Sequence, residues 1–433
     1  MKRKNHTQSG QVLVLLILGM VGMLGFTALA VDGGLVFAER RRAQNAADTS
    51  ALAAALAEIN GENLHVAALN RLASNGFNTT WEPCTPAGYD CTAGSGTNWT
   101  VQVSHPPRSG DYAGQSEYIQ VLITSTVNTS FVHFVYDGPV TTTVEAVSRA
   151  RPSTNIAPGQ AMFSDNEHDC KGLWFSGTND TIIQGGSAFS NSDADSTNCE
   201  SGVADGAGAI TLDASERISV VGTFDAHDLT LIFPDPVEGV AQVTLPNVPV
   251  PDCSGMTDYG KVIINGGTTT LQPGLYQEIK INGGDVTFAP GMYCIYGTKG
   301  LVTTGGTITG TGIMIYLQNG DLSLTGNVTL DLTAEGSTGT LVDPSNNDWA
   351  DMLFYLDSAN TEPVSIGGGS GTSYTGTMYA PGSDCEIAGG GDTLGLNSQM
   401  ICDRIKLTGT SQVTIIYNED DNYHIPPTID LAR

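Results

Sequence analysis

The side chains that could do chemistry are few and lie far apart along this chain. The seven histidines are separated by long intervals, and none stands at zinc-ligand spacing from a cysteine. The sequence contains no G-x-S-x-G, H-E-x-x-H or P-loop motif. Because no nucleophile, general base or cofactor-binding pattern is recognisable, we expect a protein that is not an enzyme and that carries no cofactor.

The best candidates for metal ligands lie in the acidic stretch of residues 190–206. Several oxygen-bearing side chains follow one another closely there, namely Asp193, Asp195, Thr197 and Asn198. Hard Ca²⁺ prefers oxygen ligands, although this stretch does not follow the pattern of an EF-hand loop. A calcium site and a simple solvated acidic loop therefore both remain open.

The cysteines indicate the compartment in which the protein folds. None belongs to a C-x-x-C motif, and their number is even. The eight cysteines are Cys84, Cys91, Cys170, Cys199, Cys253, Cys294, Cys385 and Cys402. Such a set behind a hydrophobic N-terminus predicts disulfides in an oxidising compartment. The simplest connectivity joins sequence neighbours, as 84–91, 170–199, 253–294 and 385–402, and free buried cysteines are the alternative.

Composition and charge exclude several classes of protein. Charged residues make up 15% of the 433 residues, and glycine contributes 53 of them. Such a chain is too apolar to be disordered and too rich in glycine to be mainly helical. The formal net charge of −27 repels nucleic acid and anionic lipid, so we expect no nucleic-acid partner.

An apolar segment at the N-terminus is long enough to span a bilayer. Residues 11–31 carry no charge, and three basic residues precede them, namely Lys2, Arg3 and Lys4. This order places the N-terminus in the cytoplasm and the body outside. The segment could be an uncleaved anchor, a signal peptide cut after Ala30, or a pilin-like leader cut after Gly10.

Strong helix formers continue after the apolar segment as far as Ile59. An uninterrupted helix from Gln11 to Ile59 would be roughly 73 Å long. Alanines recur along one of its faces at three- and four-residue spacing. This smooth face either packs on its own domain or allows self-association with the helix of another subunit.

The stretch "GQVLVLLILGMVGMLGFTALAVDGGLVFAERRRAQNAADTSALAAALA" resembles the N-terminal module of Flp pilus-assembly TadE/TadG-like proteins. Asp32, Gln44 and Asp48 occupy the positions of the family motif. The resemblance implies a link to pilus assembly. Pseudopilins of this family carry a glutamate five residues into the mature helix, where this chain has Leu15, which argues against processing after Gly10. The TadG-like branch is closer, and its members are expected to stay anchored in the membrane.

The remainder of the chain changes character near residue 156. Residues 60–152 combine a helical pattern with alternating β-branched runs, which predicts a small pilin-like α+β domain. Beyond it, "INGGTTTLQPGLY" and "INGGDVTFAPGMY" repeat one phrase 17 residues apart, with weaker echoes downstream. This period is typical of a parallel β-solenoid whose glycines form the corners, while an irregular β-sandwich is the alternative.

We therefore expect a transmembrane long α-helix, a small pilin-like α+β domain and an all-β region that forms a right-handed parallel β-helix. The expected segments are an anchor over 1–59, the α+β domain over 60–152, the solenoid over 156–417 and a C-terminal tail over 418–433.

The predicted function is that of a single-pass, membrane-anchored envelope protein of a Flp/Tad-type pilus or secretion apparatus. Its body would face the cell surface and serve adhesion. The expected partners are the cytoplasmic membrane, pilus or secretion proteins, further copies of the N-terminal helix and a surface glycan. Two alternatives remain: a filament subunit processed after Gly10, and a secreted carbohydrate-binding or carbohydrate-active β-helix cleaved after Ala30.

Overall fold

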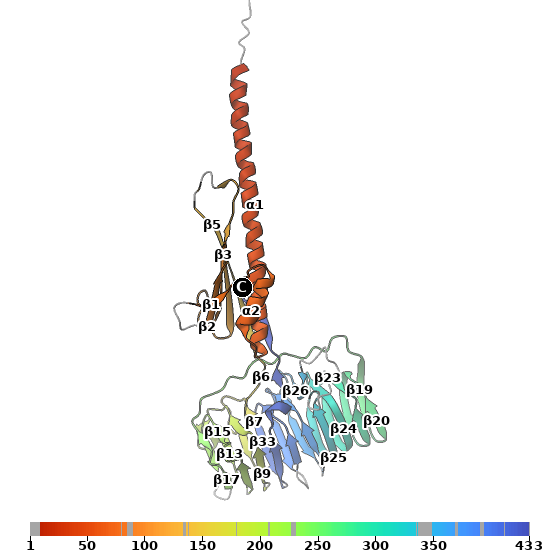
Figure 1. Cartoon of the computed structure of the whole chain (residues 1–433). Helices are drawn as coiled ribbons and strands as arrows, with labels where there is room; N and C mark the ends of the chain where they lie inside the picture. Colours follow the sequence, from red (N-terminus) through yellow and green to blue (C-terminus); the bar gives the residue numbers. More distant parts are fainter. Residues whose placement is uncertain are drawn as a thin grey trace, which may run out of the picture. The chain divides into compact units, whose positions relative to one another are not determined.

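The computed structural model describes most of the chain, whose course is shown in Figure 1. The described residues are 9–432 without 79, 85–89, 133–135, 137, 179, 207, 227–230, 335, 337–348, 369–370, 390–393 and 411. Met1–Ser153 and Pro426–Arg433 form one compact unit, here called the helix–sheet unit. Thr154–Ile425 form a second, here called the solenoid unit. Lys2, Arg3 and Lys4, used above to orient the chain, lie outside the described residues.

The helix–sheet unit packs two helices on one antiparallel sheet. The helices are α1 (Ser9–Ile59) and α2 (Leu64–Ser74). The strands, in their order across the sheet, are β1 (Trp81–Pro83), β2 (Asp90–Ser95), β3 (Trp99–His105), β4 (Tyr118–Val127), β5 (Val140–Arg151) and β36 (Thr428–Ala432). The Asn63 side chain caps α2 by accepting a hydrogen bond from the Val66 amide at 3.0 Å. Alternate residues of β3, β4 and β5 face the helices, so each strand buries its Val and Ile residues.

The C-terminus returns to this sheet and does not form a separate tail. Thr428–Ala432 pair antiparallel with β5, where Thr428 lies opposite Arg151 and Ala432 lies opposite Val147. Ile429 and Leu431 pack against the core of the unit, which explains the alternation in this short segment. The prediction of a C-terminal tail over 418–433 is therefore wrong for Thr428–Ala432, which form a strand. In the order of the chain, the solenoid unit is inserted between β5 and β36.

The solenoid unit is a stack of coils whose neighbouring strands run parallel. Its first group of strands is β7 (Gln160–Ser164), β8 (Leu173–Phe175), β9 (Thr181–Gln184), β10 (Ser187–Ser190), β13 (Gly202–Ala204), β14 (Ala209–Leu212), β15 (Ile218–Val220), β16 (Phe224–Ala226), β17 (Leu231–Phe233) and β18 (Val237–Glu238). Two small antiparallel pairs accompany it, β6 (Thr154–Asn155) with β35 (His424–Ile425), and β11 (Asp195–Ser196) with β12 (Cys199–Glu200). A short 3₁₀ helix covers Glu419–Asp421.

A second group of strands completes the stack. They are β19 (Asp258–Ile264), β20 (Thr268–Leu271), β21 (Gly274–Ile281), β22 (Asp285–Phe288), β23 (Gly291–Ile295), β24 (Leu301–Leu317), β25 (Leu322–Ala334), β26 (Met352–Leu356), β27 (Val364–Gly368), β28 (Ser373–Thr375), β29 (Thr377–Ala380), β30 (Cys385–Gly389), β31 (Leu394–Asn397), β32 (Met400–Cys402), β33 (Ile405–Gly409) and β34 (Val413–Ile416). The expected parallel β-solenoid is thus confirmed, and the β-sandwich alternative is not the fold.

The repeated phrase forms two neighbouring coils. Ile264 pairs with Ile281 and Leu271 pairs with Phe288, so equivalent residues of the two phrases stack directly. The backbone of Gly284 has a φ of +101° and lies so close to the previous coil that a Cβ atom would be 2.4 Å from the Gly267 carbonyl oxygen. A side chain at this corner would therefore separate the coils, which is the physical reason for the glycine.

The chain enters the stack in its middle and not at one end. The coil of β7, β8 and β9 pairs with β10, β13 and β14 on one side and with β32, β33 and β34 on the other. From this coil the chain winds outward to β18, crosses to β19 at the opposite end, and winds back to the starting point. Figure 1 shows β17 and β19 at opposite ends of the stack.

The crossing segment, residues 239–257, is here called the strap. It contains no strand and lies along one outer face of the stack. Val248 of the strap is 4% exposed and belongs to a cluster that includes Met314, Tyr316 and Tyr355. Burying such a valine contributes about 1.5–3 kcal/mol relative to leaving it in water.

Four disulfides join the eight cysteines, and no described cysteine is free. The pairs are Cys84–Cys91, Cys170–Cys199, Cys253–Cys294 and Cys385–Cys402. This is the neighbour-to-neighbour connectivity expected from the sequence. The third pair fixes the strap to β23, and the fourth joins β30 to β32 in neighbouring coils.

Candidate functional site

The first half of α1 has the surface of a membrane span. The large apolar side chains from Val12 to Leu29 are 52–77% exposed, on all sides of the helix. Within the described residues, α1 is the one helix that is long and apolar enough to cross a membrane. A helix that is apolar all round and not covered by its own domain is expected in lipid.

Asp32 fixes the point where the apolar half of α1 ends. Its carboxylate is 1% exposed and accepts hydrogen bonds from three consecutive backbone amides. The Ser130 amide donates to Oδ1 at 2.7 Å, and the Phe131 and Val132 amides donate to Oδ2 at 2.8 and 2.6 Å. Backbone donors in this number compensate the burial of a charge, so the segment after β4 is held firmly against α1.

Gln44 connects α1 to the sheet, and Asp48 binds the Gln44 side chain from the next turn of the helix. The Gln44 Nε2 atom donates to Asp48 Oδ1 at 2.7 Å and to the Glu145 carbonyl oxygen on β5 at 3.1 Å. Further along, the Ser148 hydroxyl donates to the Ala51 carbonyl oxygen at 2.7 Å. The sequence assigned these two residues to a family motif, and the structure gives them a positioning role between helix and strand.

The alanine face of α1 is used within its own unit. The alanines at 43, 46, 47, 51, 54 and 55 are all 0% exposed and pack under β4 and β5. Small side chains allow the helix to lie close to the sheet. Self-association through this face is therefore excluded, which corrects one of the two sequence interpretations.

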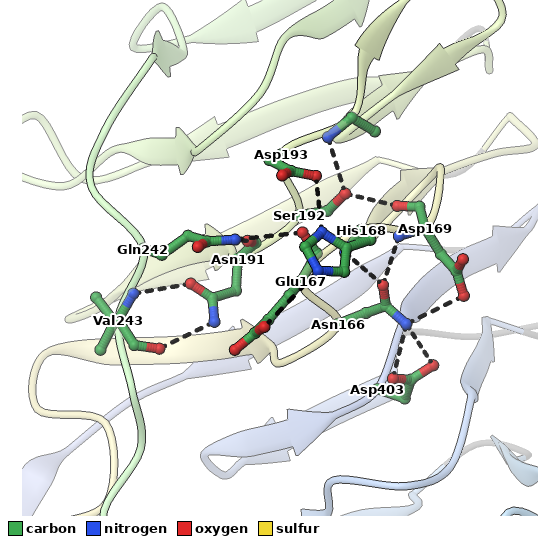
Figure 2. Close-up of polar contacts among 11 residues, drawn as sticks. Asn166, Glu167, His168, Asp169, Asn191, Ser192, Asp193, Gln242, Val243 and Asp403 are labelled. Carbon is green, nitrogen blue, oxygen red and sulfur yellow. Dashed lines mark hydrogen bonds and ion pairs between the residues drawn. The ribbon is translucent and has the colours of Figure 1, made fainter.

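The solenoid unit has a polar corner where three neighbouring coils meet, shown in Figure 2. The loop between β7 and β8 supplies Asn166, whose Nδ2 atom donates to both carboxylate oxygens of Asp403 at 2.9 and 3.1 Å. The same side chain accepts from the His168 and Asp169 amides through its Oδ1 atom, at 3.0 and 2.6 Å. Asn166 therefore stabilises the turn of its own loop and links this loop to Asp403, which follows β32 in the neighbouring coil.

The strap is tied to this corner by side chains that imitate strand pairing. The Asn191 Oδ1 atom accepts from the Val243 amide at 2.8 Å, and the Asn191 Nδ2 atom donates to the Val243 carbonyl oxygen at 2.9 Å. The Gln242 Nε2 atom donates to the carbonyl oxygens of Asn191 and Glu167 at 3.2 and 3.3 Å. Both ends of the strap are thus fixed, here by hydrogen bonds and near β23 by Cys253.

Three titratable side chains at this corner have raised pKa values. Burial raises the pKa of Asp165 to about 6, and the neighbouring carboxylates of Glu167 and Asp403 add to the rise. Burial also raises the pKa of Asp403. The hydrogen bond to Asp193, at 3.1 Å, raises the pKa of the exposed His168 imidazole.

The residues suggested as calcium ligands are not arranged as a metal site. Asp193 points to His168, whereas Asp195 is exposed in β11 and Thr197 and Asn198 are exposed in the turn that follows. Among the described residues, no group of three or more His, Cys, Asp or Glu side chains could hold a metal ion.

The strap and the contacts that Asn191 and Gln242 make with each other and with Val243 were not predicted from the sequence. One signal was present, because prolines cluster just before and within the strap and interrupt the glycine-punctuated pattern. These prolines are at positions 234, 236, 246, 249 and 251. These five prolines and the loss of Gly-Gly corners mark a segment that does not continue the coils.

Residues 10–57 match a family model described as putative Flp pilus-assembly TadE/G-like. This Tad module lies entirely within α1 and contains Asp32, Gln44 and Asp48. Its conformation explains the motif, because these residues hold the sheet against the helix beyond the apolar half.

Residues 248–420 match a second family model, which describes a domain of unknown function. This match begins in the strap and extends past β34, and it leaves out the coils from β7 to β17. No curated protein gave a significant match.

The crystal structure of the competence-associated pilin ComZ from Thermus thermophilus was also found as a similar structure. It has a TM-score of 0.27 and 11% identity over 82% of this chain and 88% of that chain. A likeness at this level supports no inference.

Proposed function

We propose that this protein is a membrane-anchored envelope component of a Flp/Tad-type pilus or secretion apparatus. The observation that carries the proposal is the Tad module at residues 10–57, whose first half is exposed apolar helix and whose Asp32 starts the folded domain. The apolar half of α1 would lie in the cytoplasmic membrane. At about 1.5 Å per residue, residues 12–31 span roughly 30 Å, which is the thickness of the hydrocarbon core.

The remaining chain would lie outside the cytoplasm. Four disulfides support an oxidising compartment for both units. The basic residues Lys2, Arg3 and Lys4 favour a cytoplasmic N-terminus. The helix–sheet unit would contact pilus or secretion proteins, and the solenoid unit would offer its surface for adhesion. We further propose that the protein acts through binding and not through catalysis, without a cofactor.

The mature N-terminus and its cellular fraction test the proposal. Intact mass should identify a chain that starts at Met1 and is recovered only in the membrane fraction. A mature start at Gln11 would instead indicate a filament subunit, although Leu15 argues against that processing. A soluble chain that starts at Val31 would overturn the anchor and favour a secreted β-helix.

Topology and partner are tested on the same cells. Protease added to spheroplasts should degrade the helix–sheet unit and the solenoid unit and leave a protected fragment that contains the apolar half of α1. Degradation of these units only after lysis would contradict the proposed orientation. Affinity purification under mild detergent should recover Tad pilus proteins. As a control, a chain in which residues 10–31 are replaced by an unrelated membrane span should reach the membrane normally.

A further inference from the structure

The solenoid unit has a surface groove that the proposed function does not yet use. It has a volume of about 470 Å³ and lies over β27, β30, β33 and β8, which belong to successive coils. The lining includes an indole ring and a set of charged side chains, namely Trp174, Lys171, Asp384, Glu386, Arg404 and Lys406. Such a combination of an aromatic surface and convergent polar groups is typical of a binding site.

The register of the coils aligns these side chains in a row. Ser365, Glu386, Lys406 and Trp174 are consecutive partners across the parallel strands. Since neighbouring strands lie about 4.8 Å apart, the row offers polar groups at regular intervals that end at an aromatic ring. A second row begins at Asp384 and Arg404, immediately before β30 and β33.

Each cation of the groove already has a carboxylate partner. Lys406 Nζ lies 3.1 Å from Glu386 Oε1, and Arg404 Nε lies 2.8 Å from Asp384 Oδ1. Lys171 Nζ lies 3.6 Å from Asp205 Oδ2. Among the described lining residues, therefore, no positive charge is left uncompensated to attract an anion, and the chain as a whole carries a net charge of −27.

Trp174 provides the aromatic surface of the groove. Its Nε1 atom donates to Asp205 Oδ1 at 3.0 Å, which fixes the orientation of the ring. The Nζ atoms of Lys171 and Lys406 lie 3.9 and 4.6 Å from the ring centroid. Both lysines are about one-third exposed, with side-chain values of 35% and 30%, so a ligand ring could displace a lysine from the indole at low cost.

Two disulfides make the groove rigid. Cys170 and Cys385 line it, and they are joined to Cys199 and Cys402 respectively. Cys170 of the first pair precedes Lys171, and Cys402 of the second lies two residues before Arg404. A site held in place before binding loses less entropy when the ligand arrives.

We propose that this groove binds a pyranose unit of an uncharged glycan. A sugar ring would stack on Trp174. Its hydroxyl groups would exchange hydrogen bonds with the paired charges, because each ion-paired carboxylate or cation keeps free lone pairs or N–H groups. An anion would have to compete with these carboxylates for the cations, whereas a polyhydroxylated neutral ligand would not. The inference rests on the proposed function in one respect, that the solenoid unit faces the cell surface.

Calorimetry on the full-length protein in lipid nanodiscs tests the inference. The probes are maltohexaose, cellohexaose and chitohexaose, with hexagalacturonate as the charged counterpart. We expect at least one neutral probe to bind, and Trp174→Ala to weaken that binding about tenfold or more. Trp174→Phe keeps an aromatic surface and should retain part of the affinity. Phe233→Ala is the matched control, because Phe233 is a 60% exposed aromatic residue on β17.

Three results would overturn the inference. These are the absence of binding by all three neutral probes at millimolar concentration, binding that Trp174→Ala leaves unchanged, and binding of hexagalacturonate alone. An unaltered thermal transition in Trp174→Ala establishes that the variant folds. Fractionation separates the two proposals: a Met1 chain in the membrane that binds no glycan refutes only the groove, and a soluble Val31 chain that binds one refutes only the anchor.

Discussion

Asn191 and Val243 exchange two hydrogen bonds, at 2.8 and 2.9 Å, although 52 residues separate them in the chain. The asparagine amide takes the place of a strand backbone and satisfies both polar groups of Val243. Because the strap has no strand of its own, this contact and the Cys253–Cys294 disulfide hold it over the apolar cluster around Val248.

Removing the Asn191 side chain should loosen the strap. Asn191→Ala leaves the Val243 amide and carbonyl groups without these partners, and Asn191 itself is 1% exposed. We expect a loss of about 1–3 kcal/mol in the free energy of unfolding of the solenoid unit. Thermal unfolding followed by circular dichroism measures it, with the exposed Asn397→Ala as control. Equal melting temperatures for the two variants would contradict the role of Asn191.

Replacing Asp32 should destabilise the helix–sheet unit without affecting membrane insertion. Asp32→Ala leaves three backbone amides without their carboxylate, which costs about 2–4 kcal/mol. Limited proteolysis of membranes should then cleave the segment after β4 faster than in the wild type. The exposed Asp111→Ala is the control. If Asp32→Ala instead abolished membrane recovery while the folded domain stayed protease-resistant, Asp32 would act in insertion and not in folding.

Asp165 should make the stability of the solenoid unit depend on pH. The pKa of this group is raised from 3.8 to about 6, mainly by burial. An acid with a raised folded-state pKa contributes stability that is fully present below its unfolded pKa and is lost as the pH rises through the folded value. Asp165→Asn should therefore stabilise the unit at pH 7.5, by about 1 kcal/mol after allowance for partial solvent exposure.

The measurement for Asp165 is the change in melting temperature between pH 4.5 and 7.5. As the pH rises from 4.5 to 7.5, the wild type should lose melting temperature relative to Asp165→Asn, which lacks the titrating carboxyl group. Asp225→Asn, at an exposed position on β16, is the control for removal of one negative charge. Parallel pH profiles for wild type and Asp165→Asn would refute the assignment.

Strand β36 should be required for the helix–sheet unit and not for the solenoid unit. Leu431 packs against the core of the former, whereas Asp430 of the same strand is exposed. Leu431→Ser should lower the stability of the helix–sheet unit by about 1–2 kcal/mol, and Asp430→Ser should leave it nearly unchanged. Hydrogen exchange of β5 peptides measures the effect. Faster exchange in solenoid peptides alone would contradict the division into two units.

The sequence was a good guide wherever the signal was local. The apolar run of residues 11–31, the alanine-rich continuation of the helix and the repeat at Ile264 and Ile281 all depend on neighbours within one or two turns or one coil. The cysteine pairing was also predictable, because each cysteine is joined to its nearest neighbour in the sequence. The candidate site was less accessible. Asp32, Gln44 and Asp48 were recognised by their residue types, but the partners of Asp32 and Gln44 in the folded unit lie about 100 residues away in the chain.

The sequence by itself determined that this chain has an apolar helix, a small α+β region and glycine-cornered coils, since each follows from residue periodicity. Only the tertiary structure decided the order of the coils, the course of the strap and the use of Thr428–Ala432 as an edge strand. The tertiary structure also decided that Trp174 pairs with Lys406, although 232 residues separate them in the chain. Backbone hydrogen bonds between strands are alike for nearly all residues, so a strand does not name its partner, and the choice is made by how all the coils close around one core.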